Sequence, residues 1–258
     1  LNSNSALETA FERLSTGKRI NSASDDAAGL AIATELNSRV SGLNQAVRNV
    51  NDGISMVQIM EGTYDEVTSI LQRMRDMAVQ AANGSLSSTE QGYLETEQTA
   101  LQSALNDALE QATFSNIDLA DNTSASVISI SIQAGSNTGD AVSIALTSAN
   151  ASNASGLGIT AIDLSSDASA AIGLADAAIG IVATQRAQLG AYQSQLESTV
   201  RNLSNVAENT AAAAGRIMDT DYAAETANLT KAQILQQAAT SVLAQANAQP
   251  QAVLSLLQ

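Results

Sequence analysis

The chain has 258 residues, a formal net charge of −15, only 2% aromatic residues, and neither cysteine nor histidine. The negative charge argues against binding to nucleic acid or to anionic membranes, because phosphates attract a positive surface. Without thiols and imidazoles, disulfides, nearly all zinc sites and the usual nucleophile–base pairs are excluded. We therefore expect a protein that is not an enzyme and has no catalytic, metal-binding or cofactor-binding residues.

Apolar residues at helical spacing predict a short helix at the start of the chain. Gly17 is placed to end this helix, and residues 18–23 form a connector. Ser24 is expected to cap the next helix, because its hydroxyl can accept a free backbone N–H, and Asp25 and Asp26 would place negative charge at the positive helix end. The apolar face of the first helix consists of Leu7, Phe11 and Leu14.

A heptad-like repeat predicts a long coiled-coil helix at about 28–82. Asn83-Gly84 ends it, and a second helix follows at about 88–112, where Ser88 with Gln91 resembles a capping box. The short link makes these two helices antiparallel neighbours. The predicted core positions of the long helix are Leu36, Val40, Leu43, Val47, Val50, Ile54, Val57, Met60, Tyr64, Val67, Leu71, Met74 and Ala78.

Strict alternation of isoleucine and serine in VISISIQ predicts a β-hairpin at about 127–147. Its turn runs from Gly135 to Asp140, and the alternation returns in the second strand at Val142, Ile144 and Leu146. The composition of residues 147–166, which are rich in Ser, Ala, Asn and Gly, indicates irregular surface structure.

Helical periodicity returns at about 168–216 and predicts a helix that packs on the 28–82 helix. Arg186 and Gln193 interrupt its second core position. We therefore expect a mainly α protein, a long antiparallel coiled-coil rod with a small β-hairpin and helical terminal segments. The predicted core positions are Ile172, Ile179, Val182, Leu189, Leu196, Val200, Leu203 and Ala207.

The last 42 residues, 217–258, combine an acidic start with an apolar tail. Asp219, Asp221 and Glu225 lack the turn glycine of a calcium loop, so they are interpreted as carboxylates at a helix start. From Thr226 to the end, Lys231 is the only charged side chain. Such a segment is costly to leave in water, and it predicts an interaction surface.

Several stretches at both ends of the chain together resemble bacterial flagellin. They are RLSTGKRINSASDDAAGLAIA (13–33), RNVNDGISMVQIMEG (48–62), ILQRMRDMAVQAANG (70–84), RAQLGAYQSQLE (186–197) and LTKAQILQQAATSVLAQANAQPQAVLSLL (229–257). The resemblance implies three regions: the remainder of an amino-terminal inner-core helix with its connector (1–27), a rod domain (28–216) and a carboxy-terminal inner-core and assembly segment (217–258). The middle is too short for a variable outer domain, and an apolar segment that flagellins carry ahead of Leu1 is expected to be missing.

The resemblance implies a secreted structural subunit that self-assembles into the helical, extracellular flagellar filament for motility. Both terminal segments would be disordered in the monomer and fold on assembly, which buries apolar area. Implied partners are other subunits, an export chaperone on the carboxy-terminal segment, and cap and hook-junction proteins. The assembly and chaperone-binding residues would be Leu229, Ile234, Leu235, Val242, Leu243, Val253, Leu254 and Leu257.

Some flagellins are detected on the rod by an animal innate immune receptor. The positions that match this face are Arg73, Met77, Gln80 and Glu97, with Met77 where recognised flagellins have leucine. The alternative is a solvated helix face that makes filament contacts only.

Other interpretations remain open on sequence alone. The apolar tail could pack within its own chain as a further helix of the rod. The protein could be a hook–filament junction protein, which has flagellin-like ends, or a coiled-coil adaptor that does not polymerise. A flagellin with an inserted metalloprotease is excluded, because its zinc motif needs histidine.

Overall fold

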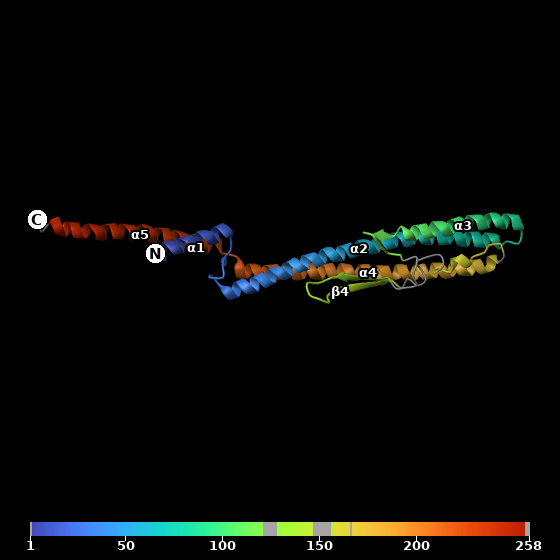
Figure 1. Cartoon of the computed structure of the whole chain (residues 1–258), viewed down its shortest axis with the longest axis horizontal. Helices are drawn as coiled ribbons and strands as arrows, with labels where there is room; N and C mark the ends of the chain where they lie inside the picture. Colours follow the sequence, from blue (N-terminus) through green and yellow to red (C-terminus); the bar gives the residue numbers. More distant parts are fainter. Residues whose placement is uncertain (1, 121–127, 147–155, 166, 256–258) are drawn as a thin grey trace. The chain divides into compact units, whose positions relative to one another are not determined.

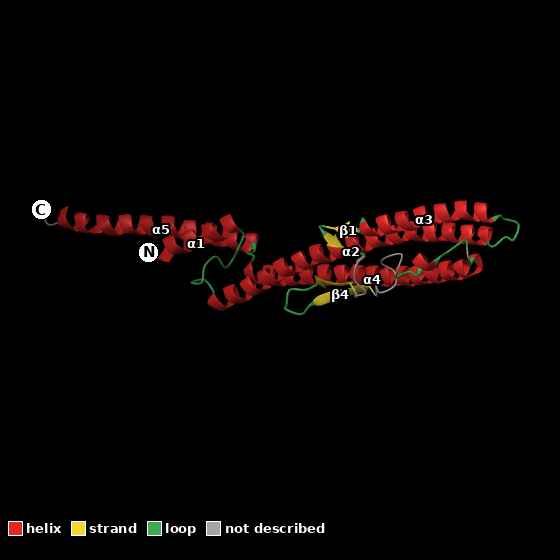
Figure 2. Cartoon of the chain, turned by 45° about the vertical axis from the view of Figure 1, so that its right-hand side comes forward, coloured by secondary structure: helices red, strands yellow, loops and turns green. Residues whose placement is uncertain are grey.

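The computed structural model describes every residue except 1, 121–127, 147–155, 166 and 256–258 (Figure 1). Within this part the chain is mainly helical, as predicted, with two small antiparallel sheets (Figure 2). The helices are α1 (Asn2–Thr16), α2 (Ala27–Ala81), α3 (Ser88–Glu110), α4 (Ala168–Met218) and α5 (Tyr222–Ser255), with a short 3₁₀ helix η2 (Ile159–Ala161). The strands are β1 (Thr113–Phe114), β2 (Ile117–Asp118), β3 (Ile128–Gln133) and β4 (Ala141–Leu146).

Two compact units divide the chain. Unit 1 comprises Leu1–Ser41 and Val206–Gln258, and unit 2 comprises Gly42–Asn205. Both boundaries fall inside helices, one in α2 and the other in α4. The domain limits expected from sequence, at 27/28 and 216/217, stay a prediction.

In unit 2, α2 and α4 run antiparallel as a coiled coil. Arg186 Nη2 lies 2.7 Å from Glu61 Oε1, while Arg75 Nε lies 2.6 Å from Asp176 Oδ1, so rising numbers on α4 meet falling numbers on α2. The side chains of α4 spaced by seven residues are buried, which confirms this part of the predicted core; they are Val182, Leu189, Leu196 and Leu203.

Small residues hold several core positions that the repeat assigned to larger ones. Val47 and Ile54 are only half-buried, whereas Ala46 and Gly53 are buried. On α4, Ile172 and Ile179 are also half-buried, and alanines face the core instead, at positions 171, 175 and 178. The repeat missed these positions because alanine and glycine carry little hydropathy, yet their size lets neighbouring elements approach closely.

The capping box of α3 lies one residue earlier than predicted. Glu90 Oε2 accepts hydrogen bonds from the backbone N–H (2.7 Å) and the hydroxyl of Ser87, and the Ser87 hydroxyl accepts from Glu90 N. Gln91 instead donates to the carbonyl oxygen of Ala81, 3.2 Å away. Both Ser87 and Ser88 fit the motif, and the carboxylate of Glu90 is the better acceptor at a positive helix end.

The predicted hairpin is β3 paired with β4, with Ile130 opposite Ile144 and Ile132 opposite Val142. Ile132 and Ile144 are buried, while the serines at 129, 131 and 143 are exposed, as the alternation predicts. Two hydrogen bonds join the Tyr192 hydroxyl of α4 to the hairpin. The hydroxyl accepts a hydrogen bond from Ala145 N at 3.2 Å and donates one to Ala145 O at 3.1 Å.

The sequence predicts irregular surface structure over 147–166, but residues 156–164 contribute to the core. Residues 147–155 lie outside the described part of the chain. The apolar side chains Leu157, Ile159, Ile162 and Leu164 are all buried. Gln102 of α3 donates to Ile159 O at 2.7 Å, while Glu95 of the same helix accepts from Leu164 N at 2.8 Å. Glycine, threonine, alanine and aspartate stand between these residues and masked an apolar pattern that packs in the core of unit 2. The sequence also missed the hairpin β1–β2, which turns at Ser115 and Asn116, both with positive φ.

In unit 1, the cap of α2 is Asp26 and not Ser24. Asp26 Oδ1 accepts from Gly29 N at 2.9 Å, which is the pattern of an N-cap. Asp25 turns back to the connector and accepts from Asn21 N and Ser22 N. These backbone hydrogen bonds, led by that of Ser22, lower the pKa of Asp25.

Of the described helices, α4 alone is long and apolar enough to cross a membrane, with an 18-residue window of mean hydropathy 1.4. The sequence contains no unbroken apolar run of that length, and alanine contributes much of the hydropathy. In the structure 28% of that window is buried, so a core face accounts for part of this apolar character.

Candidate assembly surface

The two terminal helices of unit 1 pack against each other as an antiparallel pair. Gln236 Nε2 donates to Asn4 Oδ1 at 3.0 Å, and Arg13 Nη1 lies 3.9 Å from Glu225 Oε2 at the other end of the contact. Two alanines, Ala10 of α1 and Ala232 of α5, are buried there, and their small side chains permit a close approach. The pair leaves part of α5 uncovered.

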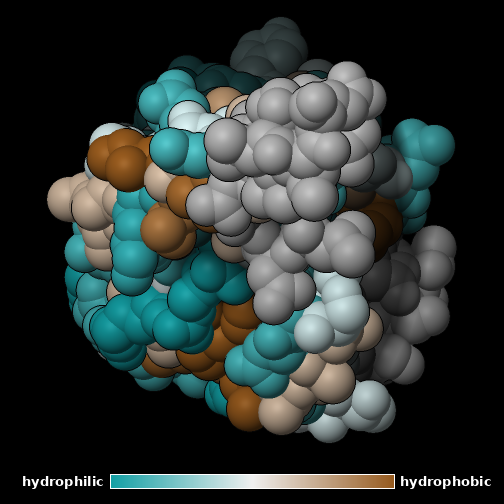
Figure 3. Space-filling view, turned by 90° about the vertical axis from the view of Figure 1, so that its left-hand side faces the viewer, coloured by the Kyte–Doolittle hydropathy of each residue, from teal (hydrophilic) through white to brown (hydrophobic). Residues whose placement is uncertain are grey.

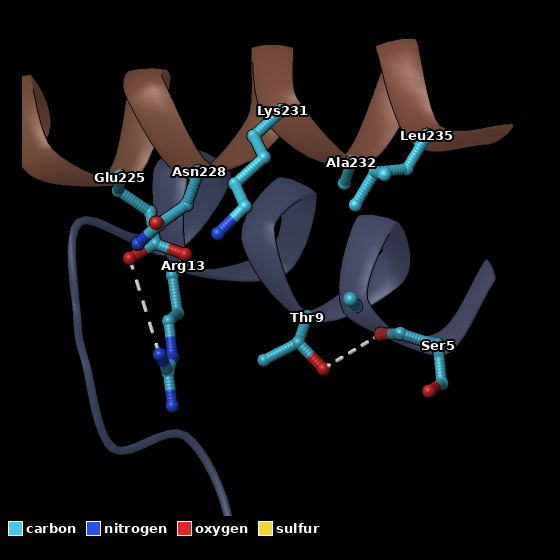
Figure 4. A pocket seen from close by; sticks show the side chains of 9 residues that line it. Ser5, Thr9, Arg13, Glu225, Asn228, Lys231, Ala232 and Leu235 are labelled. Atoms are coloured by element: carbon cyan, nitrogen blue, oxygen red, sulfur yellow. Dashed lines mark hydrogen bonds and ion pairs between the residues drawn. The ribbon is translucent and has the colours of Figure 1, made fainter. Parts of the chain in front are cut away.

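A polar groove of about 530 Å³ runs along this contact (Figure 4). In Figure 4 the Lys231 side chain extends from α5 toward α1, beside Asn228 and the Glu225–Arg13 pair. The remaining lining residues are Ser5, Ala6, Thr9, Ala232 and Leu235. The groove has two cations and one carboxylate but no nucleophile beside a general base, so it offers polar contacts and no catalytic chemistry.

An apolar face of α5 is exposed beside this groove. Ile234, Leu235, Val242 and Leu243 retain 61%, 50%, 66% and 61% of their surface. Every residue from 237 to 246 is exposed. Figure 3 shows brown hydrophobic atoms at the surface among teal hydrophilic ones.

The other predicted assembly residues are placed less fully. Leu229 is half-buried near the α1 contact. Val253 and Leu254 belong to α5, but their side chains lie outside the described part of the chain, and so does Leu257 altogether. The described assembly face therefore consists of Ile234, Leu235, Val242 and Leu243, and it is called the α5 face below.

The four predicted receptor positions do not form one exposed surface. Arg73 and Glu97 are joined by an ion pair of 2.7 Å between α2 and α3, and both remain substantially exposed. Gln80 is exposed as well. Met77, however, has no exposed surface and belongs to the core of unit 2. The resemblance to flagellins grouped it with the other three residues, but packing places its side chain in the interior.

The acidic residues before α5 act as a helix start. Asp221 Oδ1 accepts from Ala223 N at 2.9 Å and from Ala224 N at 3.3 Å, which is a capping arrangement. In the part of the chain that the structure describes, no group of three or more carboxylates could hold a metal ion.

The sequence missed the backbone pairing that joins the two connectors of unit 1. Arg19 N donates to Met218 O at 2.6 Å and Thr220 N to Gly17 O at 3.0 Å, while the Arg19 guanidinium reaches Ile217 O at 2.8 Å. These segments are about two hundred residues apart, and backbone pairing at that distance leaves no local signal.

Comparison with known proteins identifies the family. Residues 1–125 match the bacterial flagellin N-terminal helical region, and residues 172–257 match the bacterial flagellin C-terminal helical region. The chain belongs to the bacterial flagellin family. The flagellin of Halalkalibacterium halodurans is 42% identical over 253 residues, which are 97% of this chain and 92% of that protein.

Other relatives are similar to this flagellin over nearly its whole length. Flagellin A of Vibrio cholerae is 36% identical, covering 98% of this chain and 94% of its own. The flagellar filament 33 kDa core protein of Treponema phagedenis is 38% identical, covering 100% of this chain and 94% of its own. A crystal structure of Bacillus cereus flagellin has a TM-score of 0.51 at 25% identity, over 65% of this chain and 94% of that one. The protein is thus a structural subunit of the flagellar filament and not an enzyme.

Proposed function

We propose that this flagellin polymerises through the α5 face, which packs against neighbouring subunits in the filament. The observation that carries the proposal is the exposure of Ile234, Leu235, Val242 and Leu243 on a helix whose sole charge beyond Thr226 is Lys231. An apolar, nearly uncharged face gains free energy when it leaves water and has no buried charge to compensate.

The size of this gain suits a polymer with many weak contacts. Full burial of one such side chain contributes about 1.5–3 kcal/mol, and between 50% and 66% of each surface here remains to be buried. Each side chain therefore adds on the order of 1 kcal/mol, before the entropy of association is subtracted. Repeated head-to-tail contacts that do not close into a ring then give a helical filament.

The same face requires protection before assembly. We infer that an export chaperone covers α5 during secretion, because an exposed apolar helix would otherwise associate prematurely. Cap and hook-junction proteins would contact the subunit once it is outside the cell. The domain division into an inner segment at 217–258, with 1–27, and a rod at 28–216 belongs to this proposal.

The receptor interaction is a narrower proposal. The Arg73–Glu97 ion pair and Gln80 are accessible on unit 2, and burial removes Met77 from the contact surface. The proposal is supported if replacing Arg73 weakens receptor binding while the conservative change Met77→Leu leaves binding unchanged. Equal dependence on both residues would contradict it.

The test of the α5 face is elongation of short filament seeds, scored by electron microscopy. Val242→Asp should abolish elongation, because it places a charge in the contact. Gln237→Asp is the matched control: it adds the same charge on the opposite helix face and should elongate normally. Unimpaired growth of Val242→Asp would overturn the proposal, and failure of both variants would favour a general intolerance of α5 to charge.

A further inference from the structure

The link between α2 and α3 contains the only asparagine in the chain that is followed by glycine, Asn83-Gly84. Residues 82–85 are all exposed. A Cβ added to Gly84 would have no atom within 4 Å, and Gly84 is not among the residues with positive φ. Solvent therefore reaches both residues.

The Asn83 side chain is folded back over the chain that follows it. Its Oδ1 accepts a hydrogen bond from Ser85 N at 3.3 Å. This bond turns the carboxamide toward the residues that follow Asn83, and the same N–H would stabilise negative charge that develops on Oδ1. The backbone N–H of Gly84 itself has no hydrogen-bond partner among those recorded for the described residues.

We propose that Asn83 is a site of spontaneous deamidation, with water as the co-reactant. The Gly84 nitrogen attacks Asn83 Cγ and forms a new C–N bond. The Cγ–Nδ2 bond breaks, and ammonia leaves with the proton from Gly84 N. Water then opens the five-membered imide at either carbonyl: attack at Cγ yields an aspartyl residue, and attack at the main-chain carbon yields an isoaspartyl residue.

Two other asparagines show why the reaction is specific to this link. Asn21 precedes Ser22 in the connector, where the Ser22 nitrogen already donates to Asp25 Oδ2 at 2.8 Å and is not available for attack. Asn37 precedes Ser38 inside α2, where backbone nitrogens are held in helical hydrogen bonds. Both are followed by a residue with a side chain, which further hinders approach.

Either product alters the local structure. Each adds one negative charge to the flagellin. The isoaspartyl product also lengthens the main chain by one carbon, in a turn closed by a 3.1 Å hydrogen bond from Leu86 N to Asn83 O. The capping box at Ser87 and Glu90 follows directly, so we expect the start of α3 to loosen in the isoaspartyl form.

The test is incubation of the full chain in mildly alkaline buffer, with samples digested by a glutamate-specific protease. Cleavage at Glu66 and Glu90 releases residues 67–90, in which Asn83 is the only asparagine. Mass spectrometry follows the small mass gain when NH₂ is replaced by OH, and a protein isoaspartyl methyltransferase with labelled methyl donor measures the isoaspartyl product. Circular dichroism confirms that each variant is folded.

We expect Asn83 to react faster than Asn21 and Asn37, and methyl labelling to appear with time. Gly84→Ala fits the available space and should slow the reaction at least about tenfold, equivalent to about 1.4 kcal/mol in the barrier. Asn83→Gln should lose the product, because its ring would be larger. Reaction at Asn83 no faster than at Asn37, or an unchanged rate in folded Gly84→Ala, would overturn the proposal.

Discussion

Gln98 is the polar side chain most deeply placed in unit 2. It has no exposed surface, and neither its amide oxygen nor its amide nitrogen has a hydrogen-bond partner in the described part of the chain. An unsatisfied buried amide costs free energy, because it gives up its bonds to water without replacement. Single residues of this kind affect stability more than the surface charges around them.

Replacing this amide should therefore stabilise the protein. Gln98→Met keeps the length of the side chain and should raise the free energy of unfolding by about 1–3 kcal/mol. Gln102→Met, one helical turn later, should lower it, because Gln102 Nε2 donates to Ile159 O. Denaturant unfolding followed by circular dichroism compares the two. Destabilisation by both variants would show that Gln98 has a partner after all.

Gly53 is a second residue whose role depends on its neighbours. Its position on α2 is covered by Ile132 of β3, and Leu196 of α4 lies 3.6 Å from where a Cβ would stand. Gly53→Ala should lower the free energy of unfolding by about 1–3 kcal/mol, because the added methyl group overpacks this contact. Gly62→Ala on the same helix meets open space and should stabilise by about 1 kcal/mol, because alanine favours helix. Thermal unfolding distinguishes them, and equal shifts would contradict the packing argument.

At the scale of elements, the start of α3 depends on one carboxylate. Hydrogen bonds from the Ser87 backbone, and then from its hydroxyl, lower the pKa of Glu90 below its ordinary value of 4.5. A depressed carboxyl pKa stabilises the folded state above the ordinary pKa, and this contribution is lost as the pH falls through the depressed value.

Acidification should accordingly weaken the first turn of α3. In an NMR titration the Glu90 carboxyl should titrate below 4.5, and Ser87→Ala should raise its pKa toward that value. The difference in the free energy of unfolding between the native protein and Glu90→Gln should shrink as the pH falls below 4.5. A Glu90 pKa that does not respond to Ser87→Ala would contradict the capping box.

Long, regular elements could be predicted from the sequence, because the repeat of α2 and α4 and the alternation of β3 and β4 are strong signals. Exact caps could not: Ser24 and Ser88 are as suitable chemically as Asp26 and Ser87, and only the local backbone decides between them. Small core residues such as Gly53 escaped detection, because their contribution is the space they leave for Ile132.

At the scale of the whole molecule, the family could be predicted from the stretches that resemble flagellin, and the apolar character of the tail, with Lys231 as its only charge beyond Thr226, is visible in the sequence. The partner of that tail within its own chain could not be predicted, since Ala10, Ala232 and the Gln236–Asn4 bond carry no distinctive signal. Met77 was matched to the receptor face by resemblance, and its burial could not be predicted because resemblance alone does not show how a side chain packs.

The most direct test of the central claim is hydrogen exchange measured by mass spectrometry on the free chain and on assembled filaments. The α5 face is exposed in the single chain and is proposed to be buried in the polymer. Every residue from 237 to 246 is exposed in the single chain, so this stretch of α5 should open locally, and its amides should exchange fast. They should become strongly protected in the filament, while residues 42–81 of α2 should be protected in both. Exchange over 237–246 that is unchanged by assembly would contradict the account.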